Sequence, residues 1–136
     1  METITIDKDI RVLYVTATSF PEGIADALAQ IQALVPEVPG RRFFGMSRPE
    51  SAAGIIYRGA AEEMQEGEGE RLHCDTLVLK AGKYFVLTVK DYAKDIQAIG
   101  RAFQTLLHRP DLDPLGYCVE WYYNDKDVHC MIRCRS

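Results

Sequence analysis

The chain has 136 residues, of which 47% are hydrophobic and 26% are charged, and its formal net charge is −4. This length suits one compact domain, and the acidic balance argues against a protein that binds nucleic acid through a basic face. No apolar run approaches the ~20 residues that span a bilayer, and the N-terminus lacks the basic and apolar segments of a secretory signal. We therefore expect a cytoplasmic protein with no direct nucleic-acid partner and no membrane partner.

The first half of the chain predicts a strand, a helix and two further strands. Residues 10–18 are rich in β-branched and apolar side chains, which is typical of a strand. A helix is expected to follow and to end before Pro36, because apolar residues recur at helical spacing at Ile24, Leu28, Ile31 and Val35. Residues 42–47 and 54–61 are predicted as two strands around a loop rich in Pro, Ser and Gly.

The second half predicts a hairpin, a helix and another hairpin. Residues 76–80 and 83–90 flank a turn at Ala81–Gly82. Asp91 is expected to cap a helix over about residues 92–108. The last hairpin is predicted over residues 116–123 and 128–135. The acidic segment from Glu62 to Arg71 joins the two halves and is expected to be an exposed connection.

The two halves share one pattern when the chain is offset by 72 residues. The strand that contains Arg11 then falls on the strand that contains Lys83, and the two helices fall on each other. We predict one domain over residues 1–136, made of two repeats at about 1–62 and 72–136. Its fold class is α+β: duplicated β-α-β-β repeats form one antiparallel sheet, with both helices on one face and a ligand cleft on the other.

The last hairpin carries a mixed set of side chains on one of its faces. A turn centred on Asp125 and Lys126 places Tyr123 opposite Val128, and alternation then separates the two faces. The mixed face carries Cys118, Glu120, Tyr122, His129, Met131 and Arg133, whereas the apolar face is expected to lie against the helices. A carboxylate among aromatic and thioether groups suits a cationic, partly apolar molecule. The alternative is an ordinary solvated strand face with one glutamate.

Motifs for a metal, a cofactor or nucleophilic catalysis are not found in the sequence. The four cysteines form no Cys-x-x-Cys, and Cys130 and Cys134 would lie about 13 Å apart along one strand, too far for a disulfide or one metal ion. The serines lack the Gly-x-Ser-x-Gly context, and no phosphate-loop or dinucleotide fingerprint occurs. We predict no metal, no cofactor and no catalytic residue.

Three segments resemble the gyrase-inhibitor-like (GyrI-like) effector-binding domains. The stretch LKAGKYFVL, from Leu79 to Leu87, is similar to the "ipaGkYavf" segment of that family. The stretch GYCVEWY, from Gly116 to Tyr122, resembles its "fEvY" strand, and VHCMIR, at residues 128–133, resembles its final strand. The match is clearest over residues 74–134, and in the first half it rests on the helix pattern and Ile56–Tyr57.

This resemblance implies a pseudo-two-fold, barrel-like sheet with a central cleft for small organic molecules, often cationic and aromatic. It implies that Glu120 is the charge partner of the ligand and that tyrosines line the walls. With the mixed hairpin face included, the candidate ligand-binding residues are Glu120, Tyr122, Tyr84, Tyr57, His129 and Met131. The first half lacks a glutamate equivalent to Glu120, because Gly45 or Met46 falls near that position. The chain is too short for the AraC-type or MerR-type DNA-binding domain that often precedes the family, so we expect a stand-alone module.

Three functions are open on this sequence. The favoured one is a module that binds a small organic ligand in sensing, sequestration or transcription-related regulation. The second is an enzyme, because some stand-alone GyrI-like proteins hydrolyse strained, DNA-alkylating cyclopropane compounds, and Glu120 beside Tyr122 and His129 would activate water. The third is a gyrase-inhibitor-like interaction with a protein partner through Glu62, Glu63, Glu66, Glu68 and Glu70. A related duplicated fold binds haem in some proteins, for which His129 alone is weak support, and the oligomeric state is left open.

Overall fold

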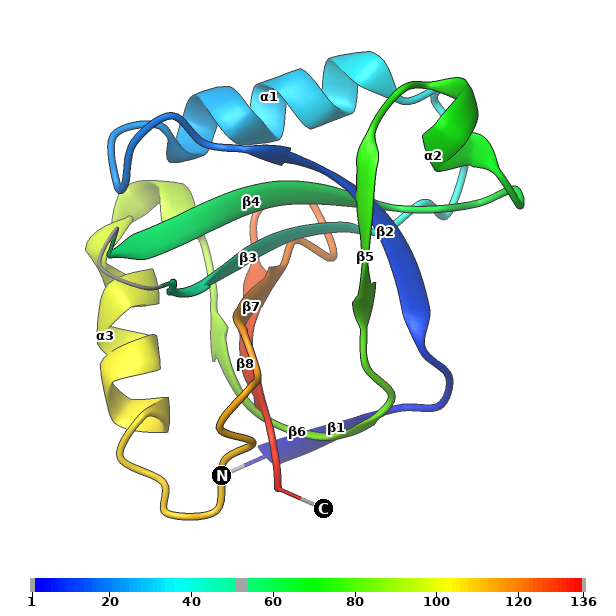
Figure 1. Cartoon of the computed structure of the whole chain (residues 1–136). Helices are drawn as coiled ribbons and strands as arrows, with labels where there is room; N and C mark the ends of the chain where they lie inside the picture. The colour runs from blue at the N-terminus through cyan, green and yellow to red at the C-terminus, as the bar shows by residue number, and fades with distance from the viewer. Residues whose placement is uncertain (1, 51–53, 136) are drawn as a thin grey trace.

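The computed structural model describes residues 2–50 and 54–135. In these residues the chain forms one curled, eight-stranded sheet in which every neighbouring pair of strands is antiparallel (Figure 1). The strands are β1 (Glu2–Ile6), β2 (Ile10–Thr16), β3 (Phe43–Pro49), β4 (Ile55–Glu62), β5 (Asp75–Leu79), β6 (Gly82–Val89), β7 (Cys118–Trp121) and β8 (Val128–Arg133). The helices are α1 (Ile24–Leu34), α2 (Glu68–Arg71) and α3 (Gln97–Leu106), with a 3-10 turn η2 (Tyr92–Lys94). The predicted α+β class with a single antiparallel sheet is confirmed.

The strand order shows how the two halves are joined. It runs β1-β6-β8-β7-β3-β4-β2-β5. If each strand is replaced by its equivalent in the other half, so that β1 to β4 exchange with β5 to β8, the same order is obtained in reverse. β3 and β7 pair at the centre, while each half sends its first strand to the other half: β1 pairs with β6, and β5 pairs with β2. Each repeat is therefore β-β-α-β-β, because β1 precedes the first strand that the sequence predicted.

The predicted hairpin between residues 76–80 and 83–90 is wrong. Both segments are strands, and Gly82 at the start of β6 adopts a positive φ of 133°, but β5 and β6 pair with different neighbours. The N–H of Ala81 donates to Asp9 Oδ1 at 2.8 Å, so the β5–β6 connection lies against the β1–β2 connection. A turn signal indicates where the chain changes direction, and it does not select the partner of the strand that follows.

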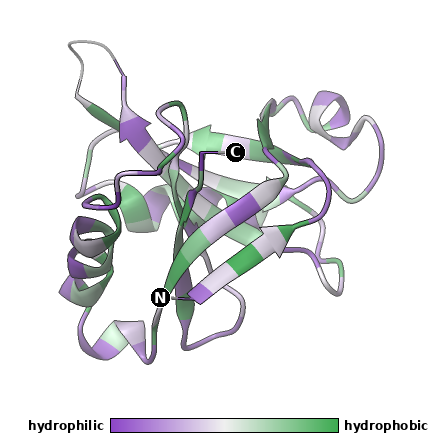
Figure 2. Ribbon diagram, turned by 90° about the horizontal axis from the view of Figure 1, so that it is seen from below, coloured by the Kyte–Doolittle hydropathy of each residue, from purple (hydrophilic) through white to green (hydrophobic). Residues whose placement is uncertain are grey.

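Alternating side chains divide the core into two layers. On the outer face, α1 packs Ile31 on Leu13 and Ala61, and α3 packs Phe103 on Phe85 and its neighbours. The inner face of the curled sheet holds Val12, Phe44, Met46, Tyr84, Val86, Val119 and Met131. Figure 2 shows hydrophobic and hydrophilic residues alternating along the strands. Both long helices thus lie on one face, as predicted, and burial of each large apolar side chain contributes about 1.5–3 kcal/mol.

The second helix begins later than predicted. Tyr92 to Lys94 form a 3-10 turn, and Asp95 has an extended φ of −151° that separates this turn from α3. Asp91 makes no side-chain cap and adopts a left-handed φ of 48°, while its N–H donates to Asp127 Oδ1 at 3.0 Å. The contact with Asp127 in the neighbouring turn holds Asp91 outside the helical conformation, so the predicted N-cap is wrong.

The acidic connection between the halves is not simply exposed. It contains α2, and Glu68 is 3% exposed. The Arg41 guanidinium donates to both oxygens of Glu68, at 2.9 and 2.8 Å, and to the carbonyl of Glu62 at 2.8 Å. The sequence prediction failed here because a glutamate-rich loop does not reveal which of its carboxylates has a buried arginine partner.

Over the described residues, the structure contains no helix with the length and apolar character needed to cross a membrane.

Candidate functional site

The final hairpin is paired one residue away from the predicted register. Glu120 lies opposite Cys130, and Trp121 lies opposite His129, so Tyr123 does not oppose Val128. The turn is set by Asn124, whose Oδ1 accepts the N–H groups of Lys126 and Asp127 at 2.7 and 2.8 Å. A slip of one residue on one strand exchanges its faces relative to the other strand. Glu120 therefore shares the outer, helix-bearing face with Cys130, so the prediction that it faces away from the helices is wrong. His129 and Met131 lie on the inner face, as predicted.

Glu120 is held by two tyrosine hydroxyl groups. Its side chain is buried, with 7% of the residue exposed. The hydroxyl of Tyr57 donates to Glu120 Oε1 at 2.8 Å, and the hydroxyl of Tyr122 donates to the same oxygen at 2.6 Å. Tyr57 lies on β4, Glu120 lies on β7, and Tyr122 directly follows the last residue of β7. The three side chains thus bring together strands from both halves of the molecule.

Gly45 makes this arrangement sterically possible. It lies on β3, between Gly59 of β4 and Glu120 of β7. A Cβ at this position would come within 1.9 Å of Tyr57 Oη and 2.6 Å of Glu120 Oε1. The missing side chain therefore leaves the space in which the tyrosine crosses β3 to reach the carboxylate.

Two further aromatic rings frame the tyrosines. Phe20 stacks on Tyr57 with ring centroids 6.2 Å apart, and Tyr92 meets Tyr122 edge-on at 5.4 Å. α1 packs on β2 and β4, while α3 packs on β6 and β8, so the central strands run between the helices (Figure 1). The carboxylate thus lies under an aromatic frame near the middle of the outer face.

Burial controls the electrostatics of this group. Desolvation raises the pKa of Glu120, and the two tyrosine hydrogen bonds only partly oppose that shift. Burial and the neighbouring carboxylate also raise the pKa of Tyr57 and of Tyr122, so both hydroxyls stay neutral donors. Within residues 2–50 and 54–135, no basic side chain forms an ion pair with Glu120. The result is a buried acid with neutral partners.

The remaining predicted residues lie elsewhere. Tyr84 and Met131 are buried in the inner core, and the Tyr84 hydroxyl donates to the Lys80 carbonyl at 2.6 Å. His129 stacks on Tyr123 with ring centroids 3.9 Å apart and shares a hydrogen bond of 2.8 Å with Thr88 Oγ1. The structure therefore gathers Glu120, Tyr57 and Tyr122 and separates them from Tyr84, His129 and Met131.

Sequence reasoning missed Phe20, Tyr92 and the steric role of Gly45. Tyr92 falls within the helix predicted over residues 92–108, and Phe20 precedes Pro21 in a segment without a clear pattern. The available signal was Gly45 itself, a glycine inside a predicted strand, which often marks a close approach of other groups.

The site borders a cavity of about 330 Å³ on its Tyr57 side. This cavity is lined by residues 17–20, ahead of α1, and by residues 55–57 of β4. Phe20, which is 39% exposed, lies both in this lining and on the Tyr57 ring. Among the described lining residues, Tyr57 is the one that contacts Glu120, through its hydroxyl.

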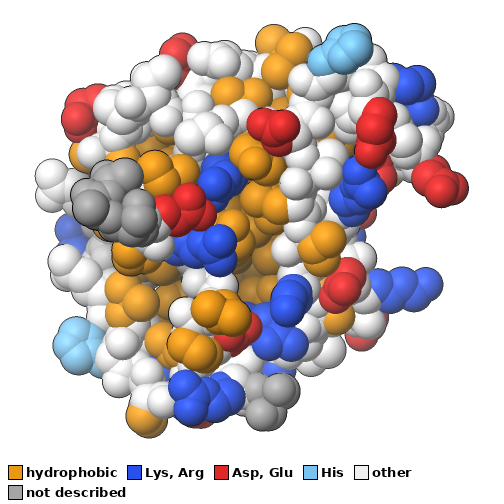
Figure 3. All heavy atoms as spheres, viewed as in Figure 1, with side chains coloured by type: hydrophobic (Ala, Val, Ile, Leu, Met, Phe, Trp, Pro, Cys, Tyr) orange, Lys and Arg blue, Asp and Glu red, His pale blue; other side chains and the backbone are white. Residues whose placement is uncertain are grey.

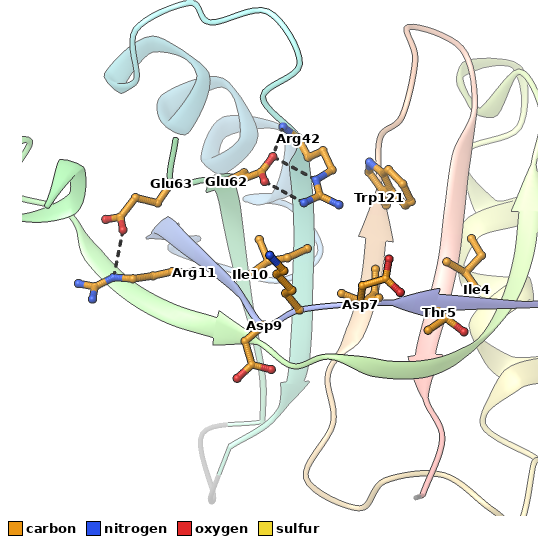
Figure 4. A pocket seen from close by; sticks show the side chains of 12 residues that line it. Ile4, Thr5, Asp7, Asp9, Ile10, Arg11, Arg42, Glu62, Glu63 and Trp121 are labelled. Carbon is orange, nitrogen blue, oxygen red and sulfur yellow. Dashed lines mark hydrogen bonds and ion pairs between the residues drawn. The ribbon is translucent and has the colours of Figure 1, made fainter. Parts of the chain in front are cut away.

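A larger cavity of about 460 Å³ lies on the inner face (Figure 4). Trp121 stands at one side of it, and the β1–β2 connection passes along another. The Arg42 guanidinium hydrogen-bonds to Glu62 at 3.0 and 2.8 Å, and Arg11 Nε lies 3.6 Å from Glu63 Oε1. The arginines of this cavity thus already have carboxylate partners.

Ion pairs with arginines also occupy the glutamates of the acidic segment from Glu62 to Arg71. Glu62 pairs with Arg42, Glu68 pairs with Arg41, and Arg11 contacts both Glu63 and Glu70. Most of the carboxylates that were candidates for a basic partner are therefore neutralised within the fold, which weakens the case for a protein-interaction surface there.

No protein-family model and no curated protein matches the chain. An integron cassette protein from Vibrio cholerae superposes with a TM-score of 0.70 at 13% identity, over 98% of this chain and 95% of that one. A candidate transcription regulation protein from Staphylococcus aureus MU50 gives a TM-score of 0.56 at 11% identity, over 97% of each chain. A hydrolase from Listeria innocua gives 0.53 at 10% identity, over 98% of this chain and 90% of that one. Similarity at these identities shows that the fold is shared.

Proposed function

We propose that this protein is a GyrI-like module that binds a small cationic, aromatic compound, with Glu120 as its charge partner. The observation that carries the proposal is the buried Glu120 carboxylate, which accepts hydrogen bonds from Tyr57 and Tyr122 and forms no ion pair within the described residues. An unpaired buried carboxylate is costly, and a cationic ligand would remove that cost. Aromatic rings beside it add stacking and cation–π attraction.

The surrounding residues suggest the path of the ligand. The cavity beside Tyr57 opens to the surface next to the partly exposed Phe20. A planar ring would replace the contact between Phe20 and Tyr57, and its cationic group would approach Glu120. Tyr84, His129 and Met131 are left out of this proposal, because they lie on the inner face.

The internal duplication is the basis of the proposed domain organisation. We infer one duplicated domain over residues 1–136, with repeats at about 1–62 and 72–136, which acts in sensing, sequestration or transcription-related regulation. The similarity in fold to the candidate transcription regulation protein from Staphylococcus aureus is in keeping with that role.

Matched probes test the proposal through thermal stability. The probes are 2-naphthylmethylammonium and neutral 2-naphthylmethanol, which share one ring system. The cation should raise the Tm of the parent protein, since a ligand at 100 times its Kd adds about 2.7 kcal/mol to stability. Glu120→Gln should lose that shift, while the control Glu66→Gln, at an exposed position, should keep it. Equal shifts from both probes, or a shift retained by Glu120→Gln, would overturn the role of the charge.

A hydrolase is the second candidate function. The raised pKa of Glu120 and its 2.6 Å contact with Tyr122 are features of a carboxylate that could take a proton from water. The similarity in fold to the hydrolase from Listeria innocua is compatible with this candidate. His129 does not assist it, because it lies on the other face of the sheet. A pure sample that binds an electrophilic cyclopropane without consuming it would argue against hydrolysis.

A further inference from the structure

A separate cavity of about 280 Å³ opens on the inner face of the sheet. Leu79 of β5, Tyr84 of β6 and Val119 of β7 form its buried lining, and Tyr117 precedes β7. Figure 3 shows a hollow on this side of the molecule, between β5 and β3, with hydrophobic side chains at its centre and charged side chains around it. Because Glu120 points to the outer face, this cavity is distinct from the site of the proposed function.

Positive charge exceeds negative charge around this cavity. Its lining includes Arg48, Lys80 and Arg133 but a single carboxylate, Asp113, among the described residues. Arg133 Nη1 lies 3.1 Å from Asp113 Oδ2, so this pair is neutral. Lys80 is exposed and forms no ion pair with the described carboxylates. One positive charge at the rim is thus uncompensated.

Arg48 adds to this excess. Its Nε lies 3.2 Å from Glu50 Oε1, but Glu50 also pairs with Arg58 at 3.1 Å, so one carboxylate serves two guanidinium groups. The Arg48 guanidinium lies 4.2 Å from the centre of the Tyr117 ring, and its Nη1 donates to the Leu115 carbonyl at 3.1 Å. These contacts hold the guanidinium at the edge of the cavity.

Apolar side chains stand exposed beside the basic groups. Leu115 is 75% exposed and Val78 is 45% exposed, and both line the cavity. With the Tyr117 ring they offer an apolar surface next to Lys80 and Arg48. This combination matches a molecule that carries an acid group on an apolar ring.

The cavity of Figure 4 differs in its charge. It has the basic residues Lys8, Arg11 and Arg42 and the acidic residues Asp7, Asp9, Glu62 and Glu63 in its lining, and Arg11 and Arg42 are paired within it. The larger cavity therefore lacks the excess of positive charge found around the 280 Å³ cavity, and it serves as an internal control for anion binding.

We propose that the 280 Å³ cavity binds a small aromatic carboxylate. Lys80 and Arg48 bind the acid group, and Tyr117 and Leu115 contact the ring. This inference does not depend on the function proposed for Glu120, and it assigns to the inner face a ligand of the opposite charge.

Titration with 2-naphthoate, followed by calorimetry and by backbone amide NMR, tests the proposal. Binding should be saturable, and the shifted amides should include Leu115, Gly116 and Tyr117. Lys80→Gln should weaken binding about tenfold, since it removes one charge-assisted contact at an exposed position. Absence of saturation at millimolar 2-naphthoate, or shifts centred on residues 4–11 instead, would overturn the proposal.

The matched control is Lys8→Gln, which removes the same charge from the other cavity. This variant should bind 2-naphthoate like the parent protein. Neutral 2-naphthylmethanol should bind Lys80→Gln and the parent alike. If Lys8→Gln and Lys80→Gln weakened the binding of 2-naphthoate equally, the net charge of the protein would account for the effect. That result would contradict the assignment of the ligand to the 280 Å³ cavity.

Discussion

At the scale of single residues, Gly45 decides whether Tyr57 and Glu120 can meet. A methyl group there would overlap the Tyr57 hydroxyl, so Gly45→Ala must displace the tyrosine, the carboxylate or β3. Overpacking of this kind costs about 1–3 kcal/mol. Urea unfolding should show this loss, and binding of 2-naphthylmethylammonium should weaken in parallel.

Gly100 provides the matched control for that substitution. It is exposed on α3, and apart from its chain neighbours and the backbone of its own helix, a Cβ there meets no described atom within 4 Å. Gly100→Ala should raise the unfolding free energy by about 0.5–1 kcal/mol through helix propensity. If both variants were stabilised, Gly45 would have no steric role and the geometry of the site would be wrong.

Glu120 makes a pH-dependent contribution to stability. Burial raises its pKa above the 4.5 of an ordinary glutamate, so the folded state holds the proton more tightly than the unfolded state. The resulting stabilisation is full below pH 4.5 and is lost as the pH rises through the raised value. Glu120→Gln cannot titrate and lacks this contribution. As the pH rises above 4.5, the parent should lose unfolding free energy relative to the variant. Parallel pH profiles in urea unfolding would contradict the raised pKa.

At the scale of elements, the buried pair of Arg41 and Glu68 fastens α2 to the start of β3. Both side chains are almost fully buried, with 1% and 4% of their surface exposed. Glu68→Gln leaves the guanidinium without its counter-charge, and breaking such a pair costs about 3–5 kcal/mol. Chemical unfolding should show this loss, whereas Glu66→Gln should stay within about 0.5 kcal/mol of the parent. A small effect of Glu68→Gln would mean that α2 is not anchored by this pair.

The same pair sets the stability of the protein in acid. Arg41 lowers the pKa of Glu68 to about 2 from its ordinary value of 4.5. Its contribution is present above pH 4.5 and is lost as the pH falls toward 2. Glu68→Gln should therefore flatten the acid limb of the stability profile.

Elements were predictable where the local pattern alone decides them. The apolar spacing located α1, the β-branched and apolar composition located β2, and the loop rich in Pro, Ser and Gly located β4. The start of α3 was not predictable, because a contact between Asp91 and Asp127 in another element holds the chain out of the helix. The register of the last hairpin was missed for a similar reason: Asn124 binds two N–H groups and shifts the pairing by one residue. That slip misplaced Glu120 and Tyr122, which were expected on the face opposite the helices, whereas His129 and Met131 lie on the inner face as expected.

At the scale of the whole molecule, the exchange of first strands makes the halves interdependent. β1 completes the sheet of the second half, and β5 completes that of the first. The inner core joins residues of both halves, so calorimetry should record one cooperative unfolding transition. Two transitions separated in temperature would show that the repeats fold independently.

The overall class followed from the sequence because duplication and apolar periodicity are properties of the chain itself. The strand exchange could not be predicted from the sequence. β1 and β5 would bury the same apolar residues whether each paired within its own half or with the other half. Ile6 and Leu79 would alternate inward in either case, and the choice between them rests on long-range pairing.

Calorimetric titration of 2-naphthylmethylammonium into the parent protein and into Glu120→Gln, repeated across pH, shows whether Glu120 anchors the ligand. A cation that pairs with Glu120 binds its ionised form, so the affinity of the parent should rise with pH and a proton should be released on binding. Glu120→Gln should bind the cation more weakly, by about 2–5 kcal/mol, and without this pH dependence. Equal affinities and equal pH profiles for the two proteins would contradict the claim that Glu120 anchors the ligand.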